Sequence, residues 1–155
     1  MTTHSRPMTR ADLPALMQLI DATELFPGAM LTDMAAPSLA TPAADELWCV
    51  FDDGAVAGLA YAAPERMTDG TWNLLLIAAD PLRQRKGIGT ALVSAIEQQL
   101  GARGGRLLLV ETSGLAEFEA TRAFYRQRGY RQEACIRDFY QAGEDKIVFV
   151  KPLPG

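Results

Sequence analysis

The sequence predicts a single mixed α/β domain over residues 1–155, with hairpin-linked strands on both sides of one strand–helix–strand unit. Apolar runs at 72–78 and 107–110 flank an amphipathic stretch at 87–100, which is the pattern of a parallel βαβ unit. The segments before and after this unit resemble paired strands with turns between them. A chain of 155 residues is also long enough to bury one core without disulfides or metals.

The N-terminal part is predicted to hold a short strand and two helices. Residues 3–8 form the strand, and Thr9 opens the first helix with Asp12 as a capping-box partner. Residues 29–35 form a second short helix, and residues 37–45, with two prolines, form a loop. The first helix carries an apolar stripe at helical spacing, made of Leu13, Leu16, Met17 and Ile20.

The rest of the chain is predicted to alternate strands with two more helices. The continuous apolar run at 72–78 predicts a strand covered on both faces. Glycines at 101 and 104–105 end the helix of the βαβ unit, as helix C-termini prefer. The other predicted elements are strands at 47–51 and 55–62, a helix at 118–128, and strands at 134–140 and 146–151.

Composition excludes several classes of protein. The formal net charge of −4 argues against a general nucleic-acid binder. The only histidine, His4, leaves no His-based triad and no multi-histidine metal site, so we expect no metal. Cys49 and Cys135 form no CxxC pair and lie in strand-like runs, so we expect both to be buried, free thiols in a reducing compartment. With no apolar run of membrane-spanning length and no secretory signal, we expect a cytoplasmic protein that does not bind membranes.

The turn before the central helix has the chemistry of a phosphate site. Gly87 and Gly89 lie at a predicted helix N-terminus, where free N–H groups and the helix dipole attract anions. Arg83, Arg85 and Lys86 add positive charge beside them. A nucleic-acid patch is the alternative interpretation of these basic residues, but the glycines and the overall negative charge disfavour it.

The spacing of these glycines distinguishes between known phosphate-binding motifs. A Walker A loop is absent, and a dinucleotide fingerprint fails because position 92 is Leu instead of Gly. The stretch Gln84-Arg-Lys-Gly-Ile-Gly89 fits the remaining pattern, Gln/Arg-x-x-Gly-x-Gly/Ala. A later helix reads Ala120-Thr-Arg-Ala-Phe-Tyr-Arg-Gln-Arg-Gly-Tyr130. On these two motifs the chain resembles the GCN5-related N-acetyltransferase (GNAT) superfamily over nearly its whole length.

The resemblance implies both a fold and a cofactor. The fold is α/β, a mixed and mostly antiparallel sheet of about seven strands with a central parallel βαβ splay and about four helices. Acetyl-CoA is the implied cosubstrate, held in a cleft where the two parallel strands separate. The implied cofactor-binding residues are Ile77, Ala78 and Ala79 for the pantetheine, and Gln84, Arg85, Lys86, Gly87, Ile88, Gly89 and Thr90 for the pyrophosphate.

The resemblance also implies catalytic groups. Tyr125 matches the family's general acid, which protonates the departing CoA thiolate, although it could instead be an aromatic packing residue. Glu111, at the end of a central strand, is the leading candidate for the general base, acting directly or through water, with Asp80 and Asp138 as rivals. The family often has Asn shortly before the alanine of the later helix, whereas this chain has Glu117, Phe118 and Glu119 there. The chain thus departs from the family pattern at the part of this helix that the resemblance places near the cofactor.

We expect the acceptor to be a small primary amine such as an amino acid. Acidic and aromatic residues suit an ammonium, and Arg137 could pair with a substrate carboxylate. The alternatives are acetylation of protein N-termini or lysines, and a non-catalytic acyl-CoA sensor. The oligomeric state stays open, a homodimer included. The candidate acceptor-binding residues are Glu24, Phe26, Arg137, Asp138 and Tyr140.

Overall fold

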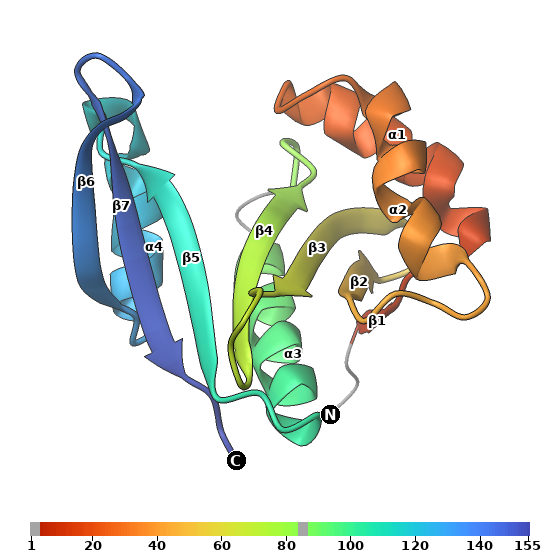
Figure 1. Cartoon of the computed structure of the whole chain (residues 1–155). Helices are drawn as coiled ribbons and strands as arrows, with labels where there is room; N and C mark the ends of the chain where they lie inside the picture. The colour runs from red at the N-terminus through yellow and green to blue at the C-terminus, as the bar shows by residue number, and fades with distance from the viewer. Residues whose placement is uncertain (1–3, 84–86) are drawn as a thin grey trace. The chain divides into compact units, whose positions relative to one another are not determined.

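The computed structural model describes residues 4–83 and 87–155, and Figure 1 shows its elements. Seven strands form one sheet in the order β1-β2-β3-β4-β5-β7-β6. This confirms the predicted mixed sheet, which is mostly antiparallel with one parallel pair, β4 and β5. The strands are β1 (Ser5–Pro7), β2 (Leu47–Asp52), β3 (Val56–Pro64), β4 (Thr71–Ala79), β5 (Leu107–Ser113), β6 (Arg131–Gln141) and β7 (Glu144–Pro152). The α-helices are α1 (Leu13–Thr23), α2 (Leu31–Leu39), α3 (Ile88–Ala102) and α4 (Glu119–Gln127).

The chain divides into two compact units. The N-terminal unit contains Met1–Ala63 and Leu76–Gln99, and the C-terminal unit contains Pro64–Leu75 and Leu100–Gly155. Both β4 and α3 therefore contribute residues to both units.

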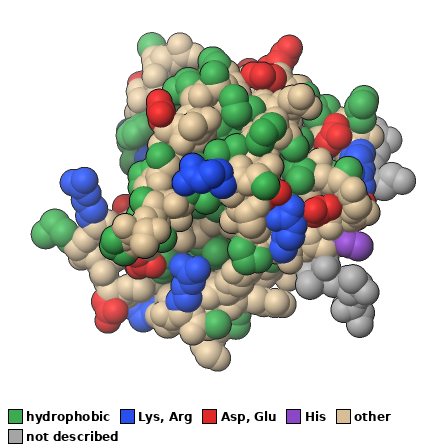
Figure 2. All heavy atoms as spheres, turned by 90° about the vertical axis from the view of Figure 1, so that its right-hand side faces the viewer, with side chains coloured by type: hydrophobic (Ala, Val, Ile, Leu, Met, Phe, Trp, Pro, Cys, Tyr) green, Lys and Arg blue, Asp and Glu red, His purple; other side chains and the backbone are tan. Residues whose placement is uncertain are grey.

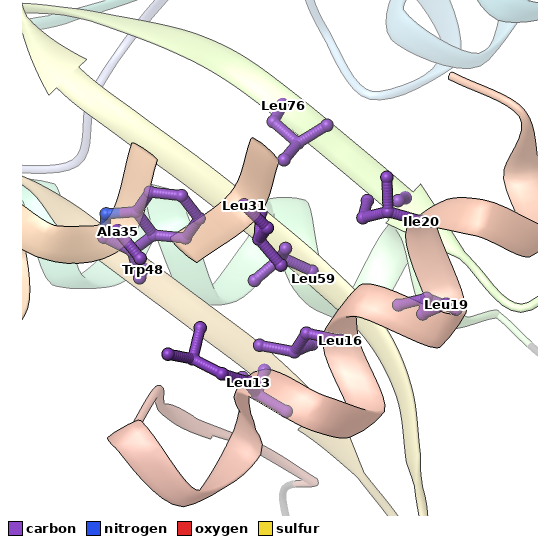
Figure 3. Close-up of a cluster of buried hydrophobic side chains, with 11 residues drawn as sticks. Leu13, Leu16, Leu19, Ile20, Leu31, Ala35, Trp48, Leu59 and Leu76 are labelled. Carbon is purple, nitrogen blue, oxygen red and sulfur yellow. The ribbon is translucent and has the colours of Figure 1, made fainter. Parts of the chain in front are cut away.

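One hydrophobic cluster holds α1 and α2 against the sheet in the N-terminal unit. The predicted apolar stripe of α1 points into it, and Leu16 and Ile20 are fully buried (Figure 3). Leu59 of β3 and Leu76 of β4 meet these side chains from the sheet (Figure 3). On the outer surface, seen from the side of α1 and α2, acidic and basic side chains are scattered among hydrophobic ones (Figure 2).

Helix α3 packs on the other face of β3, because a glycine lets it come close. Leu59 faces α1, so its neighbour Gly58 faces the opposite way. A Cβ at Gly58 would lie 2.6 Å from Ile88 Cγ2 and 2.9 Å from Leu92 Cδ1, which are distances that real side chains do not tolerate. Any side chain at position 58 would therefore push the start of α3 away from the sheet.

The 3-10 turn Arg10–Asp12, which leads into α1, is fixed by the predicted capping pair and by a residue that the sequence did not indicate. The N–H of Thr9 donates to Asp12 Oδ2 over 2.8 Å, as expected for a capping box. Arg6 of β1 donates to both carboxylate oxygens of Asp12, each over 2.8 Å, and also to Asp52. These bonds lower the pKa of Asp12 to about 2, chiefly through the hydrogen bond from Arg6.

The loop predicted at 37–45 starts later in the structure, because helix α2 extends into its first residues. Helix α2 continues through Pro37 to Leu39, preceded by a 3-10 turn at Gly28–Met30. The extra turn is held by tertiary contacts: the Ser38 hydroxyl donates to Glu46 over 2.5 Å and accepts from Trp48 Nε1 over 2.9 Å. Such contacts between distant residues outweigh the local tendency of proline to end a helix.

The C-terminal unit contains the parallel strand pair and the last hairpin. Thr71–Leu74 of β4 pair in parallel with Leu107–Val110 of β5. Strand β7 pairs antiparallel with β5 on one side and with β6 on the other. The last strand in the sequence is therefore the inner strand of the hairpin, and β6 is the edge strand of the sheet. The separation expected between the two parallel strands remains a prediction.

Two burial predictions in this unit were wrong. Leu75 is 54% exposed although it lies in the apolar run that predicted a strand covered on both faces. Cys135 was expected to be buried but is exposed, because every residue of the edge strand β6 is exposed. Cys49 in β2, by contrast, is buried as predicted.

Candidate active site

The candidate phosphate site is the start of α3 in the N-terminal unit. Gly87 has a φ of +73°, a conformation that favours glycine, and a Cβ there would meet no atom of the described residues within 4 Å. Its carbonyl accepts from the N–H of Ala91 over 3.0 Å, which closes the first turn. Ile88, Gly89 and Thr90 follow in the first turn, where helices leave N–H groups without intrahelical acceptors. Gln84, Arg85 and Lys86, also predicted for this site, lie outside the described residues.

The turn that leads from β4 toward this site is ordered by Asp80. Its N–H donates to the carbonyl of Ala57 over 2.8 Å, and its carboxylate accepts from the N–H of Leu82 over 3.0 Å. Arg83 forms an ion pair with Asp53. Ile77, Ala78 and Ala79, predicted to bind pantetheine, form the last residues of β4 before this turn. Asp80 thus has a structural role at the turn, which weakens it as a rival general base.

Tyr125 lies in an aromatic cluster of the C-terminal unit. Its ring meets Tyr130 edge-on at 5.5 Å between centroids and lies 6.2 Å from Phe149. The side chain is only 3% exposed, and burial raises the pKa of its hydroxyl. Within the part of the chain that the structure describes, this hydroxyl makes no hydrogen bond. The cluster therefore fixes the ring, and burial keeps the phenol protonated.

A buried arginine anchors the helix that carries Tyr125. Arg122 of α4 is 8% exposed, and its guanidinium donates to the carbonyls of Ser113 over 2.7 Å and Leu115 over 2.8 Å. It also donates to Glu119 over 2.7 Å. These bonds tie the segment after β5 to α4.

Glu111 lies in a polar cluster that the sequence analysis did not find. Its Oε1 accepts from Asn73 Nδ2 over 3.1 Å, and its Oε2 forms an ion pair with Lys146 Nζ at 2.5 Å. The same Asn73 nitrogen donates to Glu65 over 2.9 Å, and Lys146 lies 4.1 Å from the centroid of Phe139. One signal was available: Asn73 is the only asparagine of the chain and interrupts an apolar run.

The predicted acceptor-binding residues are divided between the two units. Glu24, with a φ of 59°, ends α1, and Phe26 packs partly buried against the N-terminal cluster. Arg137, Asp138 and Tyr140 are exposed on β6 in the C-terminal unit.

Asp138, a further rival for the base, has a structural role in the last hairpin. Its N–H donates to Asp145 Oδ1 over 3.0 Å, and its own carboxylate accepts from the N–H of Gly143 over 2.8 Å. Its φ of 57° marks an irregularity in β6. For Tyr140, burial raises the pKa of the phenol, and nearby Lys146 opposes this effect.

The sequence matches the model of the acetyltransferase (GNAT) family over residues 13–130. The chain belongs to the GNAT family. A protein from Desulfovibrio desulfuricans, described as a candidate GNAT acetyltransferase, is 30% identical and has a TM-score of 0.85, with 97% of this chain and 98% of that one covered. No curated protein matches this GNAT chain.

Two more distant solved structures share the fold of this GNAT protein. The ribosomal-protein-S18-alanine N-acetyltransferase from Escherichia coli is 23% identical, with a TM-score of 0.76 and coverage of 97% and 94% of the two chains. The aminoglycoside 6'-N-acetyltransferase from Enterococcus faecium is 17% identical, with a TM-score of 0.81 and 97% of both chains covered. Among the described residues of this GNAT protein, no helix is long and apolar enough to cross a membrane.

Proposed function

We propose that this GNAT chain transfers an acetyl group from acetyl-CoA to the primary amine of a small molecule, such as an amino acid, by direct attack in a ternary complex. The observation that carries the proposal is the hydroxyl of Tyr125. It stands in the helix that matches the family signature, in a fixed aromatic cluster, without a hydrogen-bond partner among the described residues. A non-catalytic sensor would not require such a proton donor.

The residues at the start of α3 fit the pyrophosphate of CoA. The open space at Gly87 allows phosphate oxygens to approach the backbone, and the 15 residues of α3 supply a helix dipole. We assign the pyrophosphate to residues 84–90 and the pantetheine to residues 77–79. One related aminoglycoside 6'-N-acetyltransferase, 17% identical to this chain, was solved in complex with coenzyme A.

The proposed chemistry needs one acid and one base. The amine nitrogen attacks the thioester carbonyl carbon, the carbon–sulfur bond breaks, and Tyr125 gives its proton to the departing thiolate. The proton that the nitrogen loses as the amide forms returns to the Tyr125 oxygen through water. An amine arrives as an ammonium and must first lose a proton, which we assign to Glu111 directly or through water. Both groups are anchored: Tyr125 by its ring contacts, and Glu111 by Asn73 and Lys146.

A small cationic acceptor is supported by charge. The acidic residues proposed to face the acceptor attract an ammonium over short distances. They are Glu24 at the end of α1, Asp33 in α2, and Asp138, Glu144 and Asp145 in the hairpin of β6 and β7. Arg137, exposed on β6, is the proposed partner of an acceptor carboxylate. The free thiols Cys49 and Cys135 agree with the reducing cytoplasm as the proposed location.

Acetylation of protein N-termini is the second candidate function, since one protein with the same fold is a ribosomal-protein-S18-alanine N-acetyltransferase. CoA release should be measured with free amino acids, small amines and short peptides at matched concentrations. We expect a small amine to have the highest kcat/KM. A kcat/KM for peptides a hundredfold above that of every small amine would replace the first proposal with the second. Binding of acetyl-CoA without turnover on any acceptor would instead indicate a sensor.

A further inference from the structure

One side-chain amide connects two carboxylates in the C-terminal unit. Asn73 of β4 is 5% exposed, and its Nδ2 donates to Glu65 Oε1 over 2.9 Å and to Glu111 Oε1 over 3.1 Å. The amide orientation is fixed by this arrangement, because a flipped amide would place its oxygen against two carboxylates. Both hydrogens of the amide are thereby used, and the two carboxylates are held on either side of one nitrogen.

The two carboxylates differ in their other contacts. Glu111 has both oxygens engaged, by Asn73 and by the Lys146 ammonium at 2.5 Å. The carboxylate of Glu65 receives only the hydrogen bond from Asn73, and it forms no ion pair with any residue in 4–83 or 87–155. Of the two, Glu65 is the carboxylate with an oxygen left to bind a ligand.

The backbone holds Glu65 in place. Its N–H donates to the carbonyl of Thr71 over 2.8 Å, and its carbonyl accepts from the Thr68 hydroxyl over 2.9 Å. Glu65 therefore extends from a closed turn between β3 and β4 and is partly buried.

The oxygen of the Asn73 amide lacks a hydrogen-bond donor among the described residues. This oxygen, Oδ1, is also buried. A buried carbonyl without a donor costs about 1–3 kcal/mol, so proteins rarely keep one without a reason. This oxygen belongs to the same amide that contacts both carboxylates, so it adds a third acceptor to the cluster.

The charges of the cluster define the ligand that would complete it. The Lys146 ammonium pairs with Glu111, and Glu65 has no ion pair among the described residues, so the negative charge of Glu65 is uncompensated in a partly buried place. A primary ammonium has one positive charge and three donors, which matches one free carboxylate oxygen and one orphaned carbonyl. Leu75, two residues beyond Asn73 on the same face of β4 and 54% exposed, offers an apolar neighbour for a carbon chain.

We propose that Glu65 binds the ammonium of the acceptor and that Asn73 is the residue that positions Glu65 beside Glu111. The role given to Glu65 rests on the proposed function. Glu65 selects cationic primary amines as acceptors, while Glu111 stays the proposed proton acceptor. Glu65 therefore affects mainly the affinity for the acceptor, and Glu111 mainly turnover.

The single asparagine of the chain makes a direct test possible. With 15N in asparagine side chains alone, an NMR spectrum contains one NH2 signal pair, that of Asn73. We expect propylammonium to shift this signal to saturation in the wild type, and tetramethylammonium, which has the charge but no N–H donor, to leave it in place. The shift should vanish in Glu65→Gln and persist in Glu133→Gln, a control at an exposed carboxylate on β6. No shift in the wild type, or an equal shift in Glu65→Gln, would overturn the inference.

Kinetics separate this inference from the proposed function. With an amine that the wild type acetylates, Glu65→Gln should raise KM for the amine at least tenfold, with kcat and KM for acetyl-CoA within a few-fold, and Glu65→Asp should recover part of the loss. An unchanged KM for the amine in Glu65→Gln contradicts the role of Glu65. The wild type could fail to acetylate any amine while propylammonium still shifts the Asn73 signal in a way that depends on Glu65. In that case the proposed function fails and the ammonium site stands.

Discussion

Tyr125 combines a packing role with the proposed role of general acid. Sequence analysis left open whether it is an acid or a packing residue, and its ring is indeed a packing residue, with Tyr130 and Phe149 around it. Its hydroxyl, however, contributes no hydrogen bond to any described residue. Removing the oxygen should therefore cost the fold little, so a loss of activity can be attributed to the lost proton.

For Tyr125→Phe we expect turnover to fall by about a hundredfold or more, because general acid catalysis is lost. Affinity for acetyl-CoA should stay within a few-fold. Since burial raises the pKa of Tyr125, its hydroxyl should stay protonated at neutral pH. Turnover of the wild type should therefore not fall in this range through deprotonation of Tyr125. The measurement is single-turnover kinetics with the best acceptor. Wild-type rates in the mutant, with chemistry as the slow step, would mean that Tyr125 only packs.

Part of the proposed site could be read from the sequence. Tyr125 and Glu111, the proposed acid and base, were named from a local motif and from the end of a predicted strand. Glu65, Asn73 and Lys146 were missed because they come together only through the pairing of β4 with β5 and of β5 with β7. Strand register depends on contacts between distant segments, so a single sequence does not reveal which polar side chains become neighbours.

At the scale of an element, the start of α1 was predicted and its main stabilising partner was not. Thr9 and Asp12 lie three positions apart in a recognisable capping pattern. Arg6 belongs to β1, and its bidentate contact with Asp12 requires the strand to lie beside the helix start. In α2, likewise, the contacts of Ser38 decided where the helix ends.

Arg6→Met should reduce the free energy of unfolding by about 1–2 kcal/mol at neutral pH, since a charge-assisted bidentate contact is lost at a partly exposed arginine. The pKa of Asp12 is lowered from 3.8 to about 2, so the stabilisation is complete above pH ~4 and is lost as the pH falls toward ~2. Urea unfolding at several pH values measures this. The difference between wild type and mutant should shrink across that acid window.

The matched control for this prediction is Arg10→Met. Arg10 lies in the same 3-10 turn, and among the described residues its side chain makes one long, exposed hydrogen bond, of 3.4 Å to the carbonyl of Leu39. We expect a much smaller effect there. Equal losses in both variants would show that the Arg6–Asp12 contact contributes little beyond general surface charge.

For the whole molecule, the sequence predicted the class of sheet and its central βαβ unit, because both follow from apolar runs and helical spacing. It could not predict that β7 lies between β5 and β6, since either strand of a terminal hairpin can occupy the inner position. The division of the chain into two compact units was also not visible, because β4 and α3 each contribute to both.

Binding of CoA should stabilise the whole chain. At a hundredfold excess over Kd, linkage predicts about 2.7 kcal/mol, which raises Tm by roughly 5–10 °C for a chain of this size. In Gly89→Trp the indole should block the pyrophosphate, raise Kd at least tenfold, and reduce that shift by about half or more at the same CoA concentration. Thermal denaturation and calorimetry, each referred to the variant's own ligand-free Tm, measure this. Unchanged CoA affinity in a folded Gly89→Trp would contradict the placement at α3.

The irregular edge strand β6 has a consequence for solubility. An open strand of 11 residues is a template on which another unfolded or partly folded chain could add a strand. Asp138 has a left-handed backbone conformation and is hydrogen-bonded to Asp145 and Gly143. It interrupts the regular row of N–H and C=O groups to which an added strand would bind. Charged residues at 131, 133 and 137 further disfavour stacking of like chains. The hairpin thus keeps an exposed, partly aromatic edge in solution without covering it.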